Sequence, residues 1–100
     1  MRELKEKIKY RCPEVLVNHI CGRGIVTAIL DTGVNMHPDL KGRIIGWKDM
    51  VKHREESYDD NGHGTHIAGI IAGSGFCTNG IYAGIAPESK IVSIKVLDFA

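Results

Sequence analysis

Three β-branched, largely apolar runs recur along the chain between polar or glycine-rich stretches. The runs are IVTAIL at residues 25–30, RIIGW at 43–47 and KIVSIKVLD at 90–98. The first is nearly all apolar, which is typical of a strand covered on both faces within a parallel sheet. The pattern therefore predicts three strands.

The stretch HGTHIAGIIAG, residues 63–73, has a different period. Its isoleucines, Ile67, Ile70 and Ile71, recur at roughly helical spacing among small residues, and the polar stretch DDNG precedes it. Glycines in such a helix allow close approach to a neighbouring element. We predict a tightly packed helix here, between the second and third strands. The stretches predicted as loops are residues 48–62 and 74–87.

The amino-terminal region carries short apolar patterns that predict two further helices. They cover residues 3–9 and 13–20, and Pro13 suits a first helical turn. Strand, helix and strand in succession are typical of an α/β fold with a parallel sheet. We therefore divide the chain into an amino-terminal helical segment, residues 1–22, and an α/β part, residues 23–100.

Composition places the chain among globular proteins. With 43% hydrophobic and 25% charged residues, a chain of 100 residues can form one small domain with a modest core. Thirteen basic and 12 acidic residues leave a formal net charge of +1. The chain therefore has no strong overall electrostatic field that would attract it to nucleic acid or to an anionic membrane.

The amino terminus, MRELKEKIKYRC, lacks the apolar segment of a secretory signal, and no stretch reaches the roughly 18 apolar residues of a transmembrane helix. The three cysteines, Cys12, Cys21 and Cys77, are odd in number and include no C-x-x-C pair. This spacing argues against a disulfide framework and against a zinc site. The three cysteines are therefore expected to be free thiols, which are typical of a reducing compartment, and a cytoplasmic location is expected.

Asp31 comes directly after the first apolar run, in the turn Asp-Thr-Gly. An aspartate there can simply cap the turn. It can also serve a site, because ligands of open α/β sheets bind beyond the carboxyl ends of the strands. The triplet occurs in aspartic proteases, where it supplies one of two carboxylates, and in serine proteases, where it orients a histidine. Other motifs in the sequence are needed to distinguish these roles of Asp31.

Two histidines, His63 and His66, lie at the start of the predicted helix. Metalloprotease helices space their zinc-binding histidines four apart with an intervening glutamate, and this stretch has neither feature, so no metal is expected. His63, between two glycines, can present its ring to a cleft, whereas His66 is predicted to point into the fold. A helix start disfavours an imidazolium, so a base at His63 requires a nearby carboxylate, for which Asp31 is the candidate.

Three segments, VTAILDTGVNMHPDL, DDNGHGTHIAGIIAG and GIAPESKIVSIKVLD, together resemble the amino-terminal part of the catalytic domain of subtilisin-like serine proteases. The resemblance covers roughly residues 23–98. It implies a partial subtilisin-like parallel sheet flanked by helices, and an endopeptidase that hydrolyses peptide or protein substrates by a Ser-His-Asp mechanism. In this resemblance Asp31 matches the triad aspartate, His63 matches the general base, and Leu97 matches a residue that lines a substrate subsite.

Some family features are not matched. Asp39 corresponds to a calcium-binding residue of secreted members, but the loop that would complete that site, GSGFCTNGIYAGIAP, is longer here, so neither metal nor cofactor is carried over. The Gly-Thr-Ser segment of the nucleophile and the asparagine that binds the oxyanion do not occur within these 100 residues. The serines present lack the helix-start setting of a nucleophile; they are Ser57, Ser74, Ser89 and Ser93. The chain by itself is therefore expected to be inactive, and to need the carboxyl-terminal part of a catalytic domain as its partner.

Two alternatives stay open on the sequence alone. The chain could be a non-catalytic remnant or assembly module that pairs with another chain, or with its own copy, through an exposed sheet edge at residues 25–31. It could also be a homodimeric aspartic protease, although such enzymes are built almost entirely of strands and have no use for a long helix in mid-chain. Substrate preference, oligomeric state and any calcium requirement are not determined by these residues.

Overall fold

The computed structural model describes residues 21–78 and 83–98 of the chain. The two helices predicted at residues 3–9 and 13–20 lie outside the described residues, as does all but the end of the predicted segment 1–22. The described elements, in chain order, are strand β1 (Val26–Asp31), 3-10 helix η1 (Pro38–Leu40), strand β2 (Ile44–Asp49), helix α3 (His63–Ala72), 3-10 helix η2 (Phe76–Thr78) and strand β3 (Lys90–Lys95).

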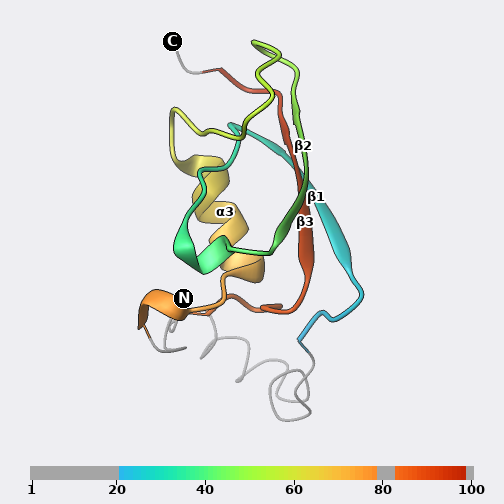
Figure 1. Cartoon of the computed structure of the whole chain (residues 1–100), viewed down its shortest axis with the longest axis vertical. Helices are drawn as coiled ribbons and strands as arrows, with labels where there is room; N and C mark the ends of the chain where they lie inside the picture. Colours follow the sequence, from blue (N-terminus) through green and yellow to red (C-terminus); the bar gives the residue numbers. More distant parts are fainter. Residues whose placement is uncertain (1–20, 79–82, 99–100) are drawn as a thin grey trace.

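The three strands form one parallel sheet in the order β1-β3-β2 (Figure 1). β1 pairs with β3 along its whole length, from Val26 opposite Lys90 to Asp31 opposite Lys95. Within the described residues β1 therefore lies at one edge of the sheet and β2 at the other. The predicted α/β class with three parallel strands is confirmed.

Small residues allow α3 to lie close against the sheet. The buried residues of the helix are Gly64, Ala68 and Ala72, which recur every four positions and so share one face. This face packs on apolar side chains of β1 and β3, Ile29 and Ile91, with Val34 and Leu40 completing the buried cluster. Figure 1 shows α3 lying along one face of the sheet.

One expectation for the first strand is wrong: β1 is not covered on both faces. Val26 and Leu30 are 54% and 60% exposed, whereas Ile29 is buried. The physical reason is that α3 covers a single face, and in Figure 1 no other described element lies over the opposite one. The described sheet thus presents an apolar face to solvent.

Two element ends differ from the sequence prediction, which extended the last strand to residue 98 and the helix to 73. β3 ends at Lys95, because the next two backbone N–H groups, of Val96 and Leu97, both donate to the carbonyl oxygen of Asp31 and turn the chain off the ladder. α3 ends at Ala72, since Gly73 has an extended ψ of 134°.

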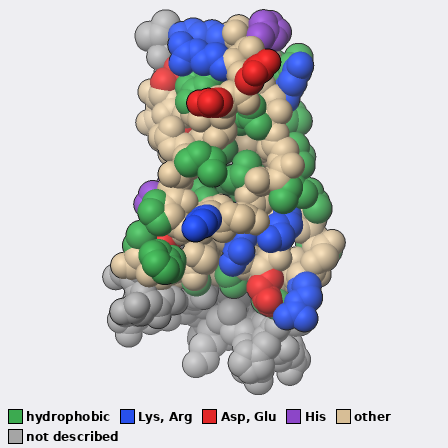
Figure 2. All heavy atoms as spheres, in the orientation of Figure 1, with side chains coloured by type: hydrophobic (Ala, Val, Ile, Leu, Met, Phe, Trp, Pro, Cys, Tyr) green, Lys and Arg blue, Asp and Glu red, His purple; other side chains and the backbone are tan. Residues whose placement is uncertain are grey.

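Charged side chains of both signs share the molecular surface. On the face shown in Figure 2, acidic and basic side chains occur in the same regions and are not separated by sign. None of the described helices has the length and apolar character needed to cross a membrane.

Candidate active site

The structure brings Asp31 and His63 together at the carboxyl end of β1. Asp31 is the last residue of that strand, and His63 is the first residue of α3. The Nδ1 atom of His63 lies 2.9 Å from each carboxylate oxygen of Asp31. The Asp31 side chain is largely buried, at 13% exposure, whereas the His63 side chain is 58% exposed. The imidazole of the pair is therefore accessible to solvent, and the carboxylate is largely shielded from it.

The environment of Asp31 keeps its side chain ionised. Burial by itself raises the pKa of this carboxyl, but the hydrogen bonds from His63 and from the Thr32 N–H, the latter at 2.7 Å, outweigh it, and the pKa lies below its ordinary value. An ionised carboxylate accepts a proton donor at Nδ1. Neutral His63 therefore carries its hydrogen on Nδ1, and its Nε2 is left as a proton acceptor.

A threonine and a buried aspartate lock the Asp31 turn to the start of α3. The hydroxyl of Thr32 donates to Asp59 Oδ1 at 2.8 Å and accepts from the Gly64 N–H at 2.9 Å. Thr32 is fully buried and Asp59 is 8% exposed, so this network is shielded from water. Because Thr32 follows Asp31 and Gly64 follows His63, the network sets the position of both members of the pair.

Asp59 also caps the helix. Its two carboxylate oxygens accept hydrogen bonds from the N–H groups of Asn61, Gly62 and Thr65, and from the Thr65 hydroxyl, at 2.7 to 3.0 Å. A negative charge at a helix start is favourable because the first N–H groups lack partners there. Burial raises the pKa of this carboxyl, but these hydrogen bonds outweigh it and hold the pKa far below its ordinary value.

The backbones of the two motifs touch, which only glycine permits. A Cβ on Gly64 would fall on the carbonyl oxygen of Gly33, and a Cβ on Gly33 would fall on that of Tyr58. Gly33 also has a φ of +112°, in the region that side chains disfavour. The glycine of Asp-Thr-Gly and the second glycine of Gly-His-Gly are therefore required by packing.

Lys95 supports the same turn from the neighbouring strand. Its side chain is fully buried, and its Nζ donates to the carbonyl oxygens of Thr32 and Leu97, at 2.6 and 3.1 Å, and to Asp60 Oδ1 at 2.9 Å. The ammonium also lies 4.9 Å from the ring centroid of Tyr58. A buried charge of this kind is tolerated because every donor position has an acceptor.

Sequence reasoning missed Asp59, Thr32 and Lys95 as determinants of the site. A signal existed for Asp59, since an aspartate shortly before a helix is a recognised cap. Thr32 belonged to the Asp-Thr-Gly turn but had no predicted partner. No local sequence signal indicated that Lys95 is buried, because lysines at such positions in a strand are commonly exposed.

The structure also places the other two residues that the sequence analysis discussed, Leu97 and His66. Leu97 lies just beyond β3, where its N–H donates to the Asp31 carbonyl oxygen at 3.2 Å and its side chain is 45% exposed. His66, predicted to point into the fold, is exposed, and that prediction is wrong. The buried face of α3 is made of Gly64, Ala68 and Ala72, so a side chain at position 66 faces away from it.

Comparison with known proteins identifies the family. The family model described as the subtilase family, peptidase S8, matches residues 22–100. The serine protease AprX of Bacillus subtilis is 53% identical over 79 residues, which cover 79% of this chain and 18% of that protein. The major intracellular serine protease of the same organism is 44% identical over 97% of this chain and 32% of its own length.

Solved structures agree with the sequence matches. A psychrophilic protease superimposes with a TM-score of 0.68 at 41% identity, over 76% of this chain and 26% of that one. MycP1, solved with its N-terminal propeptide removed, also gives 0.68, at 29% identity over 91% of this chain and 28% of its own. The chain therefore spans about a third or less of the length of these relatives. A family match over most of its residues shows that the chain belongs to the subtilase family of serine proteases.

Proposed function

We propose that this chain is the amino-terminal part of a catalytic domain that hydrolyses peptide bonds, and that it contributes the acid and the base of a Ser-His-Asp triad. The observation that carries the proposal is the contact of His63 Nδ1 with both oxygens of Asp31, at 2.9 Å. In such a triad the carboxylate holds the imidazole in one tautomer and stabilises its protonated form. His63 Nε2 then removes the proton of a serine hydroxyl and returns it to the leaving amine.

Leu97 is proposed to contact the substrate. It leaves β3 beside Asp31, and its exposed side chain stands at the carboxyl end of the sheet, where ligands of α/β folds bind. The substrate is then a peptide or protein that lies across this end of the sheet, in contact with the imidazole of His63.

The nucleophile is proposed to come from a carboxyl-terminal segment that these 100 residues do not contain. Ser89 and Ser93 are buried, and the Ser89 hydroxyl donates to the Ala86 carbonyl oxygen. Ser74 Oγ accepts the Phe76 N–H. None of these settings exposes an activated hydroxyl to His63. A cytoplasmic location is proposed because two relatives are named intracellular serine proteases.

The test joins this chain to the carboxyl-terminal part of a subtilase catalytic domain and uses a serine-directed fluorophosphonate probe. The joined protein is expected to be labelled and to cleave peptides, and the 100 residues alone are expected to do neither. In the joined protein Asp31→Ala should reduce kcat by about 10⁴-fold and His63→Ala by about 10⁶-fold, losses of the size that the corresponding changes cause in a subtilisin. Stoichiometric labelling of the 100 residues, or full activity of His63→Ala, would contradict the proposal.

A second candidate function is assembly through the sheet edge. β1 lies at an edge of the described sheet, and its Val26 and Leu30 side chains are exposed on the uncovered face. An edge strand with apolar side chains is a template for another chain. The partner would be a second copy or a complementary fragment; nucleic acid and membrane are not proposed, given the net charge of +1.

A further inference from the structure

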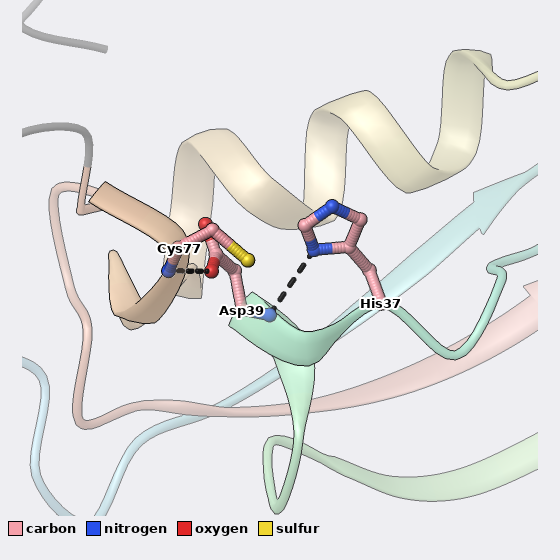
Figure 3. A group of neighbouring side chains, drawn as sticks. All are labelled: His37, Asp39 and Cys77. Carbon is pink, nitrogen blue, oxygen red and sulfur yellow. Dashed lines mark hydrogen bonds between the residues drawn. The ribbon is translucent and has the colours of Figure 1, made fainter. Parts of the chain in front are cut away.

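Three side chains with metal-binding atoms meet at η1 and η2, apart from the Asp31 and His63 pair. His37 precedes η1, Asp39 lies within it and Cys77 lies in η2. One ligand atom from each, an imidazole nitrogen, a carboxylate oxygen and the cysteine sulfur, all lie within 4.8 Å of one another. Figure 3 shows the sulfur of Cys77 between the carboxylate of Asp39 and the ring of His37.

Backbone hydrogen bonds hold these residues in place. The N–H of Cys77 donates to Asp39 Oδ1 at 2.8 Å, and the N–H of Ser74 donates to the Asp39 carbonyl oxygen at 2.7 Å. The N–H of Asp39 donates to His37 Nδ1 at 3.1 Å, which orients the ring. Two segments 38 residues apart are thus joined at the point where the three ligand atoms converge.

We propose that His37, Asp39 and Cys77 bind a zinc ion. A set of one nitrogen, one oxygen and one sulfur is suited to Zn²⁺, which accepts imidazole, carboxylate and thiolate together. Calcium is a poor match, because it prefers six or more oxygen ligands.

The surroundings leave room for a fourth ligand and a path for the ion. A cleft of about 380 Å³ beside the site is bordered by His37, Asp39 and His66, so water can complete a tetrahedron. His37 and Cys77 are exposed and Asp39 is partly exposed, so the ion can enter from solvent. Binding at Nδ1 replaces the single hydrogen bond from the Asp39 N–H, while the bond from Cys77 to Asp39 Oδ1 stays to orient the carboxylate.

The site does not depend on the proposed proteolytic function. A zinc ion here would tie η1 to η2, and so fix the loop that follows α3 against the segment that follows β1. The proposal departs from the sequence expectation against a metal, which rested on the spacing of the cysteines, on the spacing of His63 and His66, and on the unmatched calcium loop for Asp39. His37 and Cys77 are far apart in the sequence and come together only in the folded chain, so the sequence alone did not reveal the cluster.

Titration of the reduced full chain with Co²⁺ tests the proposal, because a thiolate bound to cobalt gives a charge-transfer absorption. We expect one equivalent of Co²⁺ to produce this absorption and one equivalent of Zn²⁺ to abolish it. Cys77→Ser should remove the absorption, and His37→Ala and Asp39→Asn should each weaken binding by at least about 10-fold. Asp39→Asn retains an acceptor for the Cys77 N–H, so the loop contact is preserved.

The matched control is the double variant Cys12→Ser, Cys21→Ser, which leaves Cys77 as the one cysteine of the chain. It should bind Co²⁺ with the same absorption as the unchanged chain. In parallel, Zn²⁺ should raise the thermal unfolding midpoint of the unchanged chain and of the double variant, but not of Cys77→Ser. Absorption that persists in Cys77→Ser, or a chain that binds neither ion, would overturn the proposal.

Discussion

Gly64 packs against Gly33 so closely that a side chain on Gly64 would occupy the place of the Gly33 carbonyl oxygen. This contact joins the residue after His63 to the turn that follows Asp31. The distance between the two members of the candidate pair is therefore set by a backbone contact in the buried interior, and the exposed imidazole depends on that contact for its place.

Gly64→Ala tests this contact. The new methyl group must displace the backbone of the turn, so we expect the free energy of unfolding to fall by about 3 kcal/mol. Gly69→Ala in the same helix is the control, because its Cβ would meet nothing within 4 Å. That variant should be more stable by about 0.5–1 kcal/mol, since alanine favours the helix. Urea unfolding measures both, and equal effects of the two changes would contradict the packing argument.

Asp59→Asn should destabilise the chain by about 2–3 kcal/mol, because charged hydrogen bonds to several donors are lost. The amide of asparagine also places a donor against the N–H groups that Asp59 accepts. Glu56→Gln, at an exposed position, is the control and should change little. Urea unfolding at neutral pH measures the difference. An Asp59→Asn variant with an unchanged free energy of unfolding would refute the capping role.

The stability of the chain should fall in acid. The folded pKa of Asp59 lies below its ordinary value of 3.8, so the unfolded chain binds more protons in this range. Its contribution to stability is therefore complete above about pH 5 and is lost as the pH falls through 4 toward the folded pKa. Asp59→Asn should show a shallower decline between pH 6 and about pH 3. A slope remains, because the pKa values of Asp31, Asp49, Asp60 and Glu88 are lowered in the same direction. Identical slopes would contradict the assignment.

Lys95→Met should destabilise the chain by about 2–3 kcal/mol, because it removes charged hydrogen bonds to the Thr32 and Leu97 carbonyl oxygens in a buried setting. Lys90→Met on the same strand is the control, since Lys90 is partly exposed and, among the described residues, its Nζ donates to the Gly42 carbonyl oxygen. Thermal unfolding distinguishes them. If both variants melt together, Lys95 does not support the turn.

The tautomer of His63 can be observed by ¹⁵N NMR of the imidazole rings. At a pH where the ring is neutral, we expect the hydrogen on Nδ1, because Asp31 accepts it at 2.9 Å. Asp31→Ala should return His63 to the Nε2–H form that free imidazole side chains favour. The exposed His66 serves as an internal reference in the same spectra. A His63 spectrum that is unchanged by Asp31→Ala would show that the pair is not hydrogen-bonded in solution.

Association through the uncovered sheet is tested by Leu30→Lys. Leu30 is 60% exposed on β1, and a charge there should weaken self-association by about 10-fold, the loss expected for one apolar side chain at a contact. Phe76→Ser changes an equally apolar position, 75% exposed, that is not part of the sheet, and should have little effect. Sedimentation velocity over a concentration series measures both. An equal loss in the two variants would point to unspecific association.

Local patterns in the sequence determined most of the fold class and the candidate pair. The β-branched runs predicted three strands, and the glycine-rich run with helical spacing predicted α3, because these periodicities depend on near neighbours in the chain. Asp31 and His63 could be joined because each stands at the end of an element, and a parallel sheet brings such ends to one edge.

Tertiary structure alone decided burial and long-range contacts. Lys95 is buried and Leu30 is exposed, the reverse of what their chemistry suggests, because burial depends on what packs opposite each strand face. His66 faces solvent since the small residues of α3 face the sheet. The meeting of His37 with Cys77 follows from the contact between η1 and η2, which no local pattern records. Packing between distant segments is the physical reason that these features could not be predicted from the sequence.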